Sequence, residues 1–164
     1  MRRFTDNAGR SWTIELTVGA IGRVKSLSDG RFNLWEPDKL FGDEKSLQAT
    51  LLLDFSTLAE VLWLLLCQQA EASSVAAEQF AESLGAESIL SARDAFFGEW
   101  RDFFQQLQRP DQAMSLEKTL AWVKVAQQKL ATAVTDERVV GLDRKVMAEM
   151  DQALKTSLGK LPAC

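Results

Sequence analysis

The sequence contains no histidine and no tyrosine among its 164 residues. Histidine is the commonest general base and metal ligand near neutral pH, so its absence excludes Ser-His and Cys-His nucleophile systems and histidine-containing zinc sites. No phosphate-binding loop and no dinucleotide-binding glycine motif occurs either. We therefore expect a protein that is not an enzyme, with no catalytic residue, cofactor or metal site. An enzyme that uses carboxylates alone, such as Asp94 with Glu99, is the remaining alternative.

Only two cysteines are present, Cys67 and Cys164, and they form no Cys-x-x-Cys motif. Cys67 lies within an apolar run, where a free thiol behaves as a small hydrophobe. A structural disulfide is therefore not expected, and the pattern fits a reducing cytosol. The opening residues MRRFTDNAGRSW have no apolar stretch behind their two arginines. A secretory signal is not expected, and the sequence predicts a cytoplasmic protein.

Positive charge is in the minority: 19 Lys and Arg stand against 23 Asp and Glu, which gives a formal charge of −4. An acidic chain repels phosphate backbones, so we expect no nucleic-acid partner. The basic residues that do cluster lie near the N-terminus and predict a solvated face: Arg2, Arg3, Arg10, Arg23, Lys25 and Arg31. The Gly19–Gly22 spacing next to them resembles an RNA-binding loop, but the surrounding sheet and helix pattern of that fold is missing.

The first part of the chain, residues 2–29, predicts a β-hairpin and a short helix. RRFT and RSWTIELT are rich in strand-forming residues, and residues 6–9 between them have turn chemistry. Trp12 and Ile14 alternate with polar residues, as on a half-buried strand. A lone hairpin is marginally stable in water, so we expect it to pack on the helices that follow.

Two less regular segments come next. In VGAIGRVKSLSD, Ile21, Val24 and Leu27 recur at every third position and predict a short helix that two glycines weaken. DGRFNLWEPDKLFGDE is loop-like yet rich in aromatic and aliphatic residues. We expect these side chains to turn back into the core, and a flap that contacts a partner is the alternative.

Residues 46–109 predict a helical core. Asp54 or Ser56 can cap a helix that runs to about Ala72. This helix contains VLWLLLC, seven consecutive apolar residues, but acidic residues interrupt the longer run well before the roughly 20 residues that a membrane helix needs. We expect no membrane span. A helix that is apolar on every side is expected to be covered on every side, so Leu62–Leu66 is predicted to be the central helix of the bundle.

Two further helices are predicted before residue 110. Ser74 can cap a small helix through Leu84, which Gly85 ends. The next helix runs from about residue 87 to residue 108, and Pro110 closes it.

The segment AFFGEWRDFF, residues 95–104, is the strongest aromatic feature of the sequence. Neighbouring residues on a helix point about 100° apart, so Phe96 with Phe97, and Phe103 with Phe104, need cover on two sides. The core is expected to bury most of this face. We expect Phe97 and Phe104 to be the members left for the C-terminal hairpin or for a partner.

Residues 110–164 predict a C-terminal helical hairpin, and RPDQAMS, residues 109–115, marks the expected domain boundary. Leu116, Leu120 and Val123 share one face of its first helix, with Trp122 at the edge. The second helix carries a short heptad-like seam: Val139, Leu142, Val146, Met150 and Ala153. Docking on the core of residues 1–109 and use in oligomerisation are both open. The expected fold is mainly α, a helical bundle with a short N-terminal β-hairpin and this C-terminal hairpin.

The order of these parts resembles that of tail assembly chaperones, small acidic proteins encoded with phage-type tails, and of related prophage proteins. The hairpin FTDNAGRSWTIELT leads to the weak helix IGRVKSL, then to LLLDFSTLAEVLWLLL, SSVAAEQFAESL and a long helix ending in DFF and RP. The resemblance covers roughly residues 3–110, and the segment after Pro110 departs from it.

The resemblance implies a non-enzymatic protein that binds the long tape-measure protein and helps tail-tube subunits to polymerise around it. The expected partner is therefore a protein of the tape-measure or tail-tube type. The expected partner-binding residues are Phe97, Phe104, Trp122, Val146 and Met150. The alternative is a helical structural or regulatory module of the bacterial cytosol that self-associates through its C-terminal hairpin.

Overall fold

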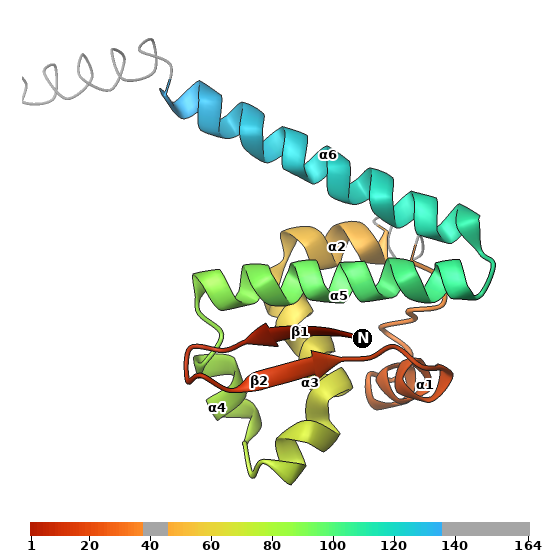
Figure 1. Ribbon diagram of the computed structural model, residues 1–164, viewed down its shortest axis with the longest axis vertical. Coiled ribbons are helices and arrows are strands. Elements are labelled where there is room, and N and C mark those ends of the chain that lie inside the picture. The colour runs from red at the N-terminus through yellow and green to blue at the C-terminus, as the bar shows by residue number, and fades with distance from the viewer. Residues whose placement is uncertain (38–45, 136–164) are drawn as a thin grey trace, which may run out of the picture. The chain divides into compact units, whose positions relative to one another are not determined.

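The computed structural model describes residues 1–37 and 46–135. In chain order its elements are β1 (Arg2–Thr5), β2 (Ser11–Ile14), α1 (Val18–Leu27), α2 (Leu47–Leu53), α3 (Phe55–Ala72), α4 (Ala77–Glu82), α5 (Ala86–Gln106) and α6 (Pro110–Thr135). The two strands pair antiparallel in one sheet (Figure 1). The prediction of a mainly α fold with an N-terminal β-hairpin is confirmed.

The hairpin turn forms where the sequence predicts it. The Asp6 N–H donates to the Arg10 carbonyl at 3.0 Å, and the Gly9 N–H donates to the Asp6 carbonyl at 3.0 Å. Gly9 has φ +78°, a left-handed conformation that glycine adopts without steric cost. Trp12 and Ile14 are buried, which confirms the predicted alternation of β2.

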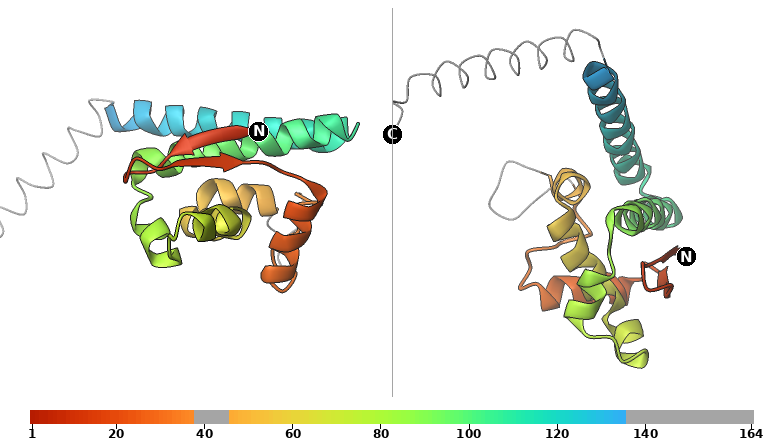
Figure 2. Two further views of the ribbon diagram at one scale, coloured as in Figure 1. Left: turned by 60° about the horizontal axis from the view of Figure 1, so that its bottom comes forward. Right: turned by 90° about the vertical axis from the view of Figure 1, so that its left-hand side faces the viewer.

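The hairpin packs on helices along both of its strands. β1 lies along α5, and β2 faces α3 (Figure 1). In the left view of Figure 2, β1 crosses in front of α5, and α1, α3 and α4 lie below the two strands. Phe4 and Trp12, which are directly opposite each other in the hairpin, are both buried. The expectation that the hairpin packs on the helices is therefore confirmed.

The first helix confirms the predicted element and corrects one of its apolar positions. Thr17 caps α1 by accepting a hydrogen bond from the Ala20 N–H at 3.1 Å. Ile21 and Val24 are buried, but Leu27 is exposed. Leu27 is the last residue of α1, the helix that packs on α3 through its buried residues Ala20, Ile21 and Val24.

The apolar segment of residues 47–72 forms two helices rather than one. Asp54 ends α2 and caps α3, accepting hydrogen bonds from the Ser56 N–H at 2.9 Å and the Thr57 N–H at 3.3 Å. The predicted cap and the predicted end at Ala72 are confirmed, whereas the separate helix α2 is not anticipated from the sequence. A carboxylate that satisfies the first N–H groups of α3 starts a new helix direction at this residue.

The run VLWLLLC is largely but not wholly covered. Its buried residues are Val61, Leu62, Leu65 and Leu66, while Trp63, Leu64 and Cys67 are half-buried. Among the helices of residues 1–37 and 46–135, none alone is long and apolar enough to cross a membrane. α2 and α3 reach that length and composition only when taken together, and they are bent by 108° at the break between them.

Replacing the cap residue tests the start of α3. Asp54→Ala removes the acceptor of the first N–H groups of the helix and of the Thr57 hydroxyl, which donates to Asp54 at 2.6 Å. We expect the free energy of unfolding to fall by about 1 kcal/mol. Urea denaturation followed by circular dichroism measures this loss. Asp54→Asn keeps an acceptor and should lose less, so equal losses in both variants would contradict the cap.

The apolar loop between α1 and α2 turns back into the core as expected. Leu34 is fully buried, and its carbonyl accepts a hydrogen bond from the indole N–H of Trp100 at 2.9 Å. Trp35 is half-buried and packs with its ring centroid 5.5 Å from that of Phe103. The rest of this loop, residues 38–45, lies outside the described residues.

The link between α4 and α5 corrects two predictions. Ser74 does not cap α4; it has φ +53°, and the N-cap residue is Ala76. Gly85 does not end α4, which stops at Glu82, but is the N-cap residue of α5. A Cβ at Gly85 would lie 2.2 Å from the Asn7 side-chain nitrogen. The glycine therefore permits close approach of the hairpin turn, a requirement that local sequence does not reveal.

Pro110 is the first residue of α6, where its missing N–H is no loss. The structure divides into two compact units, Met1–Ala121 and Trp122–Cys164, and the division falls within α6. The second helix of the predicted C-terminal hairpin lies in residues 136–164, outside the described residues. A boundary at residues 109–110 and the docking of that hairpin therefore stay predictions.

Candidate functional site

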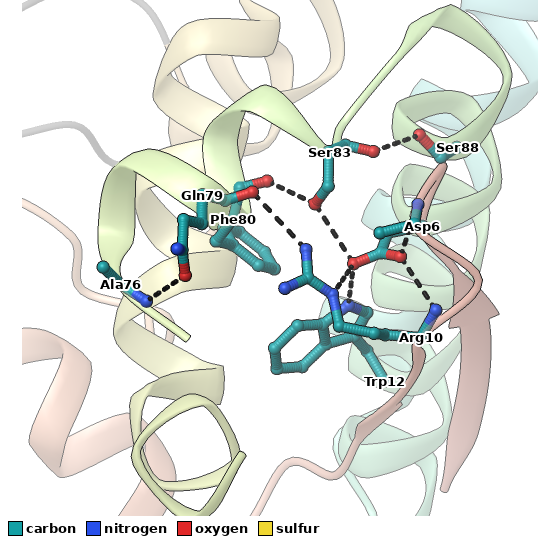
Figure 3. Close-up of polar contacts among 9 residues, drawn as sticks. Asp6, Arg10, Trp12, Ala76, Gln79, Phe80, Ser83 and Ser88 are labelled. Atoms are coloured by element: carbon teal, nitrogen blue, oxygen red, sulfur yellow. Dashed lines mark hydrogen bonds and ion pairs between the residues drawn. The ribbon is translucent and has the colours of Figure 1, made fainter. Parts of the chain in front are cut away.

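The most extensive polar cluster of the described residues surrounds the carboxylate of Asp6 at the hairpin turn (Figure 3). Asp6 Oδ1 accepts from the N–H groups of Ala8 at 3.0 Å and Arg10 at 2.9 Å. Asp6 Oδ2 accepts from Arg10 Nε at 2.7 Å and from the Trp12 indole N–H at 2.9 Å. The Ser83 hydroxyl lies 3.1 Å from Asp6 Oδ2 and 2.7 Å from the Phe80 carbonyl, so its single hydrogen is shared. We call these four side chains, Asp6, Arg10, Trp12 and Ser83, the Asp6 network.

The Asp6 carboxylate is held ionised by its surroundings. Burial raises its pKa, but hydrogen bonds from Trp12, from the backbone and side chain of Arg10, and from Ser83 outweigh that effect. The pKa of Asp6 is lowered from 3.8 to about 2. Five donors occupy its two oxygens, so this carboxylate has neither the pKa nor the free acceptor positions of a general base.

The Asp6 network joins the hairpin to the α4–α5 link. The Trp12 ring packs edge-on against Phe80, with centroids 5.1 Å apart. The Asn7 N–H donates to the Ser83 carbonyl at 2.9 Å, and Arg10 Nη2 lies 3.4 Å from the Gln79 carbonyl. These contacts connect the hairpin turn to α4 and to the residues that follow it, so we assign the network a role in positioning the hairpin.

A cleft of about 480 Å³ opens elsewhere in the same unit, between β2 and its continuation, α1 and the C-terminal half of α3. This volume falls within the range of small-ligand sites. The residues that line it are Thr13, Glu15, Thr17, Ala20, Arg23, Leu65, Leu66, Gln68 and Gln69. It therefore combines a strand edge, two leucines and charged groups of both signs.

The strand edge in this cleft is closed by a side chain. The Thr13 N–H donates to Gln69 Oε1 at 3.1 Å, and Gln69 Nε2 donates to the Thr13 carbonyl at 2.6 Å. The Gln69 amide thus makes the two hydrogen bonds that a residue of a neighbouring strand would make. It occupies the outward-facing backbone groups of an edge strand, which would otherwise be open to pairing.

Arg23 differs from three of the other arginines of the predicted basic cluster. Arg2, Arg10 and Arg31 form ion pairs with Asp102, Asp6 and Glu60 respectively. Arg23 forms no ion pair with any residue that the structure describes, and its Nε is buried without a hydrogen-bond partner. The three paired arginines keep 30–60% of their side chains exposed, and the expectation of one solvated basic face stays a prediction.

Two of the expected partner-binding residues are not at the surface. Phe97 and Phe104, which were expected to be left for the C-terminal hairpin or for a partner, are both 0% exposed. Neither ring is open to a partner in this structure, and their role in partner binding stays a prediction. The helix α5 has β1 against one side and α3 against another. The covered strip is therefore wide enough for both members of each adjacent pair. The ring centroids of Phe96 and Phe97 lie 5.4 Å apart, and those of Phe103 and Phe104 lie 5.7 Å apart.

Trp122 is the one expected partner-binding residue that the structure describes as exposed. Its exposed fraction is 65%, and that of Val125 on the same helix is 49%. Residues three apart are neighbours on a helix surface, so the two side chains form a small apolar patch, which we call the Trp122 patch. Val146 and Met150 lie outside the described residues.

The acidic groups do not form a second centre in the part of the chain that is described. Asp94 Oδ1 accepts from Arg93 Nη2 at 2.9 Å, whereas Glu99 lies 2.5 Å from the amino group of Met1. Within residues 1–37 and 46–135, no group of three potential ligands is placed to bind a metal.

The cleft is the feature that sequence reasoning missed. Gln69 appears in the sequence only as a polar residue that ends an apolar run, and its partner Thr13 is 56 residues away. No local pattern marks such a pair. Comparison of the chain with protein-family models, with curated proteins and with solved structures gave no match.

Proposed function

We propose that this protein is a non-enzymatic, protein-binding assembly chaperone or adaptor of a phage-tail-like system. It masks apolar helices of a tape-measure or tail-tube partner until they assemble. The order of hairpin and helices over roughly residues 3–110 supports the kind of system, through its resemblance to tail assembly chaperones. The Trp122 patch supports binding of a protein.

The exposure of Trp122 is the observation that carries the proposal. An indole ring buries a large apolar area when it is covered, and tryptophan is enriched among the residues that dominate interface energies. With 65% of its surface in solvent, and Val125 beside it, Trp122 offers that area to an apolar helix. The formal charge of −4 keeps such a protein soluble while it exposes this patch.

Replacing Trp122 tests the proposal. The full chain is mixed with recombinant helical segments of the tape-measure protein and with tail-tube subunits encoded beside it, and affinity is measured by isothermal titration. Trp122→Ala is expected to weaken the complex at least about tenfold, because it removes the central apolar group of the patch. The free energy of unfolding should change little, since the ring is largely exposed.

Leu27→Ala is the matched control, because Leu27 is an exposed apolar residue of α1 whose replacement should leave affinity unchanged. If neither probe binds the unaltered chain, the proposal is wrong. Sedimentation equilibrium distinguishes the alternative function. A chain that binds neither probe but self-associates through Trp122 would be a self-associating helical module.

A further inference from the structure

The Gln69 amide is the starting point, because it fills the position of a missing strand. Its two hydrogen bonds to Thr13 are the pair that an added antiparallel strand would form with that residue. Gln69 lies near the C-terminal end of α3, and its side chain is half-buried. An incoming peptide that exchanged with the amide would replace two hydrogen bonds by two others. The exchange itself is therefore nearly neutral in free energy.

Because the exchange of hydrogen bonds is nearly neutral, binding needs a further favourable contact, and Arg23 can provide it. A buried donor without a partner is destabilising, and such groups are rare in folded proteins. The Nε of Arg23 is one of them. A guanidinium pairs with a carboxylate through two parallel hydrogen bonds. Glu15 also lines the cleft, but it forms no ion pair with Arg23.

The remaining walls of the cleft suit one side chain of an extended segment. Leu65 and Leu66 are buried residues of α3 that still contribute to the lining. In an extended peptide, alternate side chains point to opposite sides, so one can lie against the leucines while the backbone meets Thr13. Recognition by strand addition uses this division, since the main chain provides affinity and side-chain pockets provide selectivity.

We propose that this cleft binds an extended peptide segment that carries a carboxylate. The segment adds to the outer edge of β2 in place of the Gln69 side chain, and its carboxylate pairs with the Arg23 guanidinium. The site lies wholly within the unit Met1–Ala121 and uses no residue of the Trp122 patch. It does not depend on the proposed assembly function.

The test uses the full chain and fluorescein-labelled short peptides with blocked ends. The peptides alternate valine and threonine and carry one glutamate, placed at each position in turn, and a second set has glutamine in its place. Fluorescence polarisation measures the dissociation constants. At the best position we expect the glutamate peptide to bind at least about tenfold more tightly than its glutamine counterpart, and Arg23→Gln to abolish this difference.

Two further variants separate the parts of the mechanism. Lys25→Gln makes the same charge change on the same helix, at an exposed residue that does not line the cleft, and should leave binding unchanged. Gln69→Ala removes the competing amide and should tighten binding of both peptide sets. The Thr13 amide signal in a nitrogen–proton correlation spectrum should shift on addition of peptide.

Three results would overturn the inference. The first is absence of binding by every peptide at millimolar concentration. The second is an equal loss of affinity in Arg23→Gln and Lys25→Gln. The third is unchanged binding of a peptide whose backbone nitrogens are methylated, because such a peptide cannot donate to the Thr13 carbonyl.

Discussion

Replacing Asp6 with alanine is expected to lower the free energy of unfolding by about 3 kcal/mol at pH 7. The substitution removes a buried charge that accepts five hydrogen bonds, and loss of one partner from a buried charged pair typically costs about 3–5 kcal/mol. The lower end applies because the Arg10 side chain is 30% exposed and can turn to solvent. The Trp12 indole N–H has no such escape. Urea denaturation followed by circular dichroism measures the loss.

The difference in unfolding free energy between the wild-type chain and Asp6→Ala is expected to depend on pH, with a sign that follows from the pKa of Asp6. An aspartate in an unfolded chain has a pKa near 3.9, whereas Asp6 in the fold has a pKa of about 2. A lowered pKa in the folded state stabilises the fold above pH 4, and this contribution disappears as the pH falls from about 4 to about 2. The stability gap between the wild-type chain and Asp6→Ala should therefore shrink by about 2 kcal/mol across that window.

Ser83→Ala serves as the matched control for Asp6. It removes only the shared hydroxyl, so we expect a loss of about 1 kcal/mol. The pH window should narrow only slightly, because Ser83 contributes least among the hydrogen bonds that lower the pKa of Asp6. If Asp6→Ala were as stable as the wild-type chain, or if the gap between them grew on acidification, the described role of the network would be contradicted.

Replacing Trp100 with alanine is expected to cost about 3–5 kcal/mol of unfolding free energy. Trp100 is fully buried, and its ring centroid lies 5.3 Å from that of Phe96 and 5.8 Å from that of Phe97. Truncation leaves a cavity among these rings and removes the donor to the Leu34 carbonyl. Native domains are typically stable by only about 5–15 kcal/mol. We therefore expect the midpoint of urea denaturation to fall severely.

Trp100→Phe keeps part of the packing at this site. It retains a six-membered aromatic ring and removes the five-membered ring with its N–H, so a loss of about 1–3 kcal/mol, smaller than that of Trp100→Ala, is expected from the unpaired Leu34 carbonyl and the space left by the lost atoms. Equal losses in both variants would show that the ring contributes little, contrary to its position at the centre of the α5 aromatic face.

The elements of the fold could be predicted where local chemistry decides them. The turn at residues 6–9 follows from its own residues, and the start of α3 follows from the carboxylate of Asp54. The apolar loop also packs into the core as predicted, because burying an apolar side chain such as Leu34 is favourable. The helix α2 was not anticipated, although the break before α3 lies at Asp54, the cap residue that the sequence predicts.

The candidate sites could be predicted only in small part. Trp122 was expected at the surface from its place at the edge of a helix face, and it is exposed. Phe97 and Phe104 were expected to be left for the C-terminal hairpin or for a partner, on the premise that the core covers one face of α5, and both are buried. In the fold, β1 and α3 cover α5 from two sides. The spacing of apolar residues along a helix shows which face is apolar, but not how many elements pack against the helix.

The sequence by itself determined the local conformations of this protein and the chemistry that it lacks. With no histidine and no tyrosine, whole classes of site are absent whatever the fold, and turns and caps depend on residues a few positions apart. Only the tertiary structure decided the pairing of Asp6 with Ser83, which is 77 residues away, and the hydrogen bonding of the Thr13 backbone by the Gln69 side chain. Such contacts join side chains that no spacing relates, because the packing of α3, α4 and α5 on the hairpin brings them together.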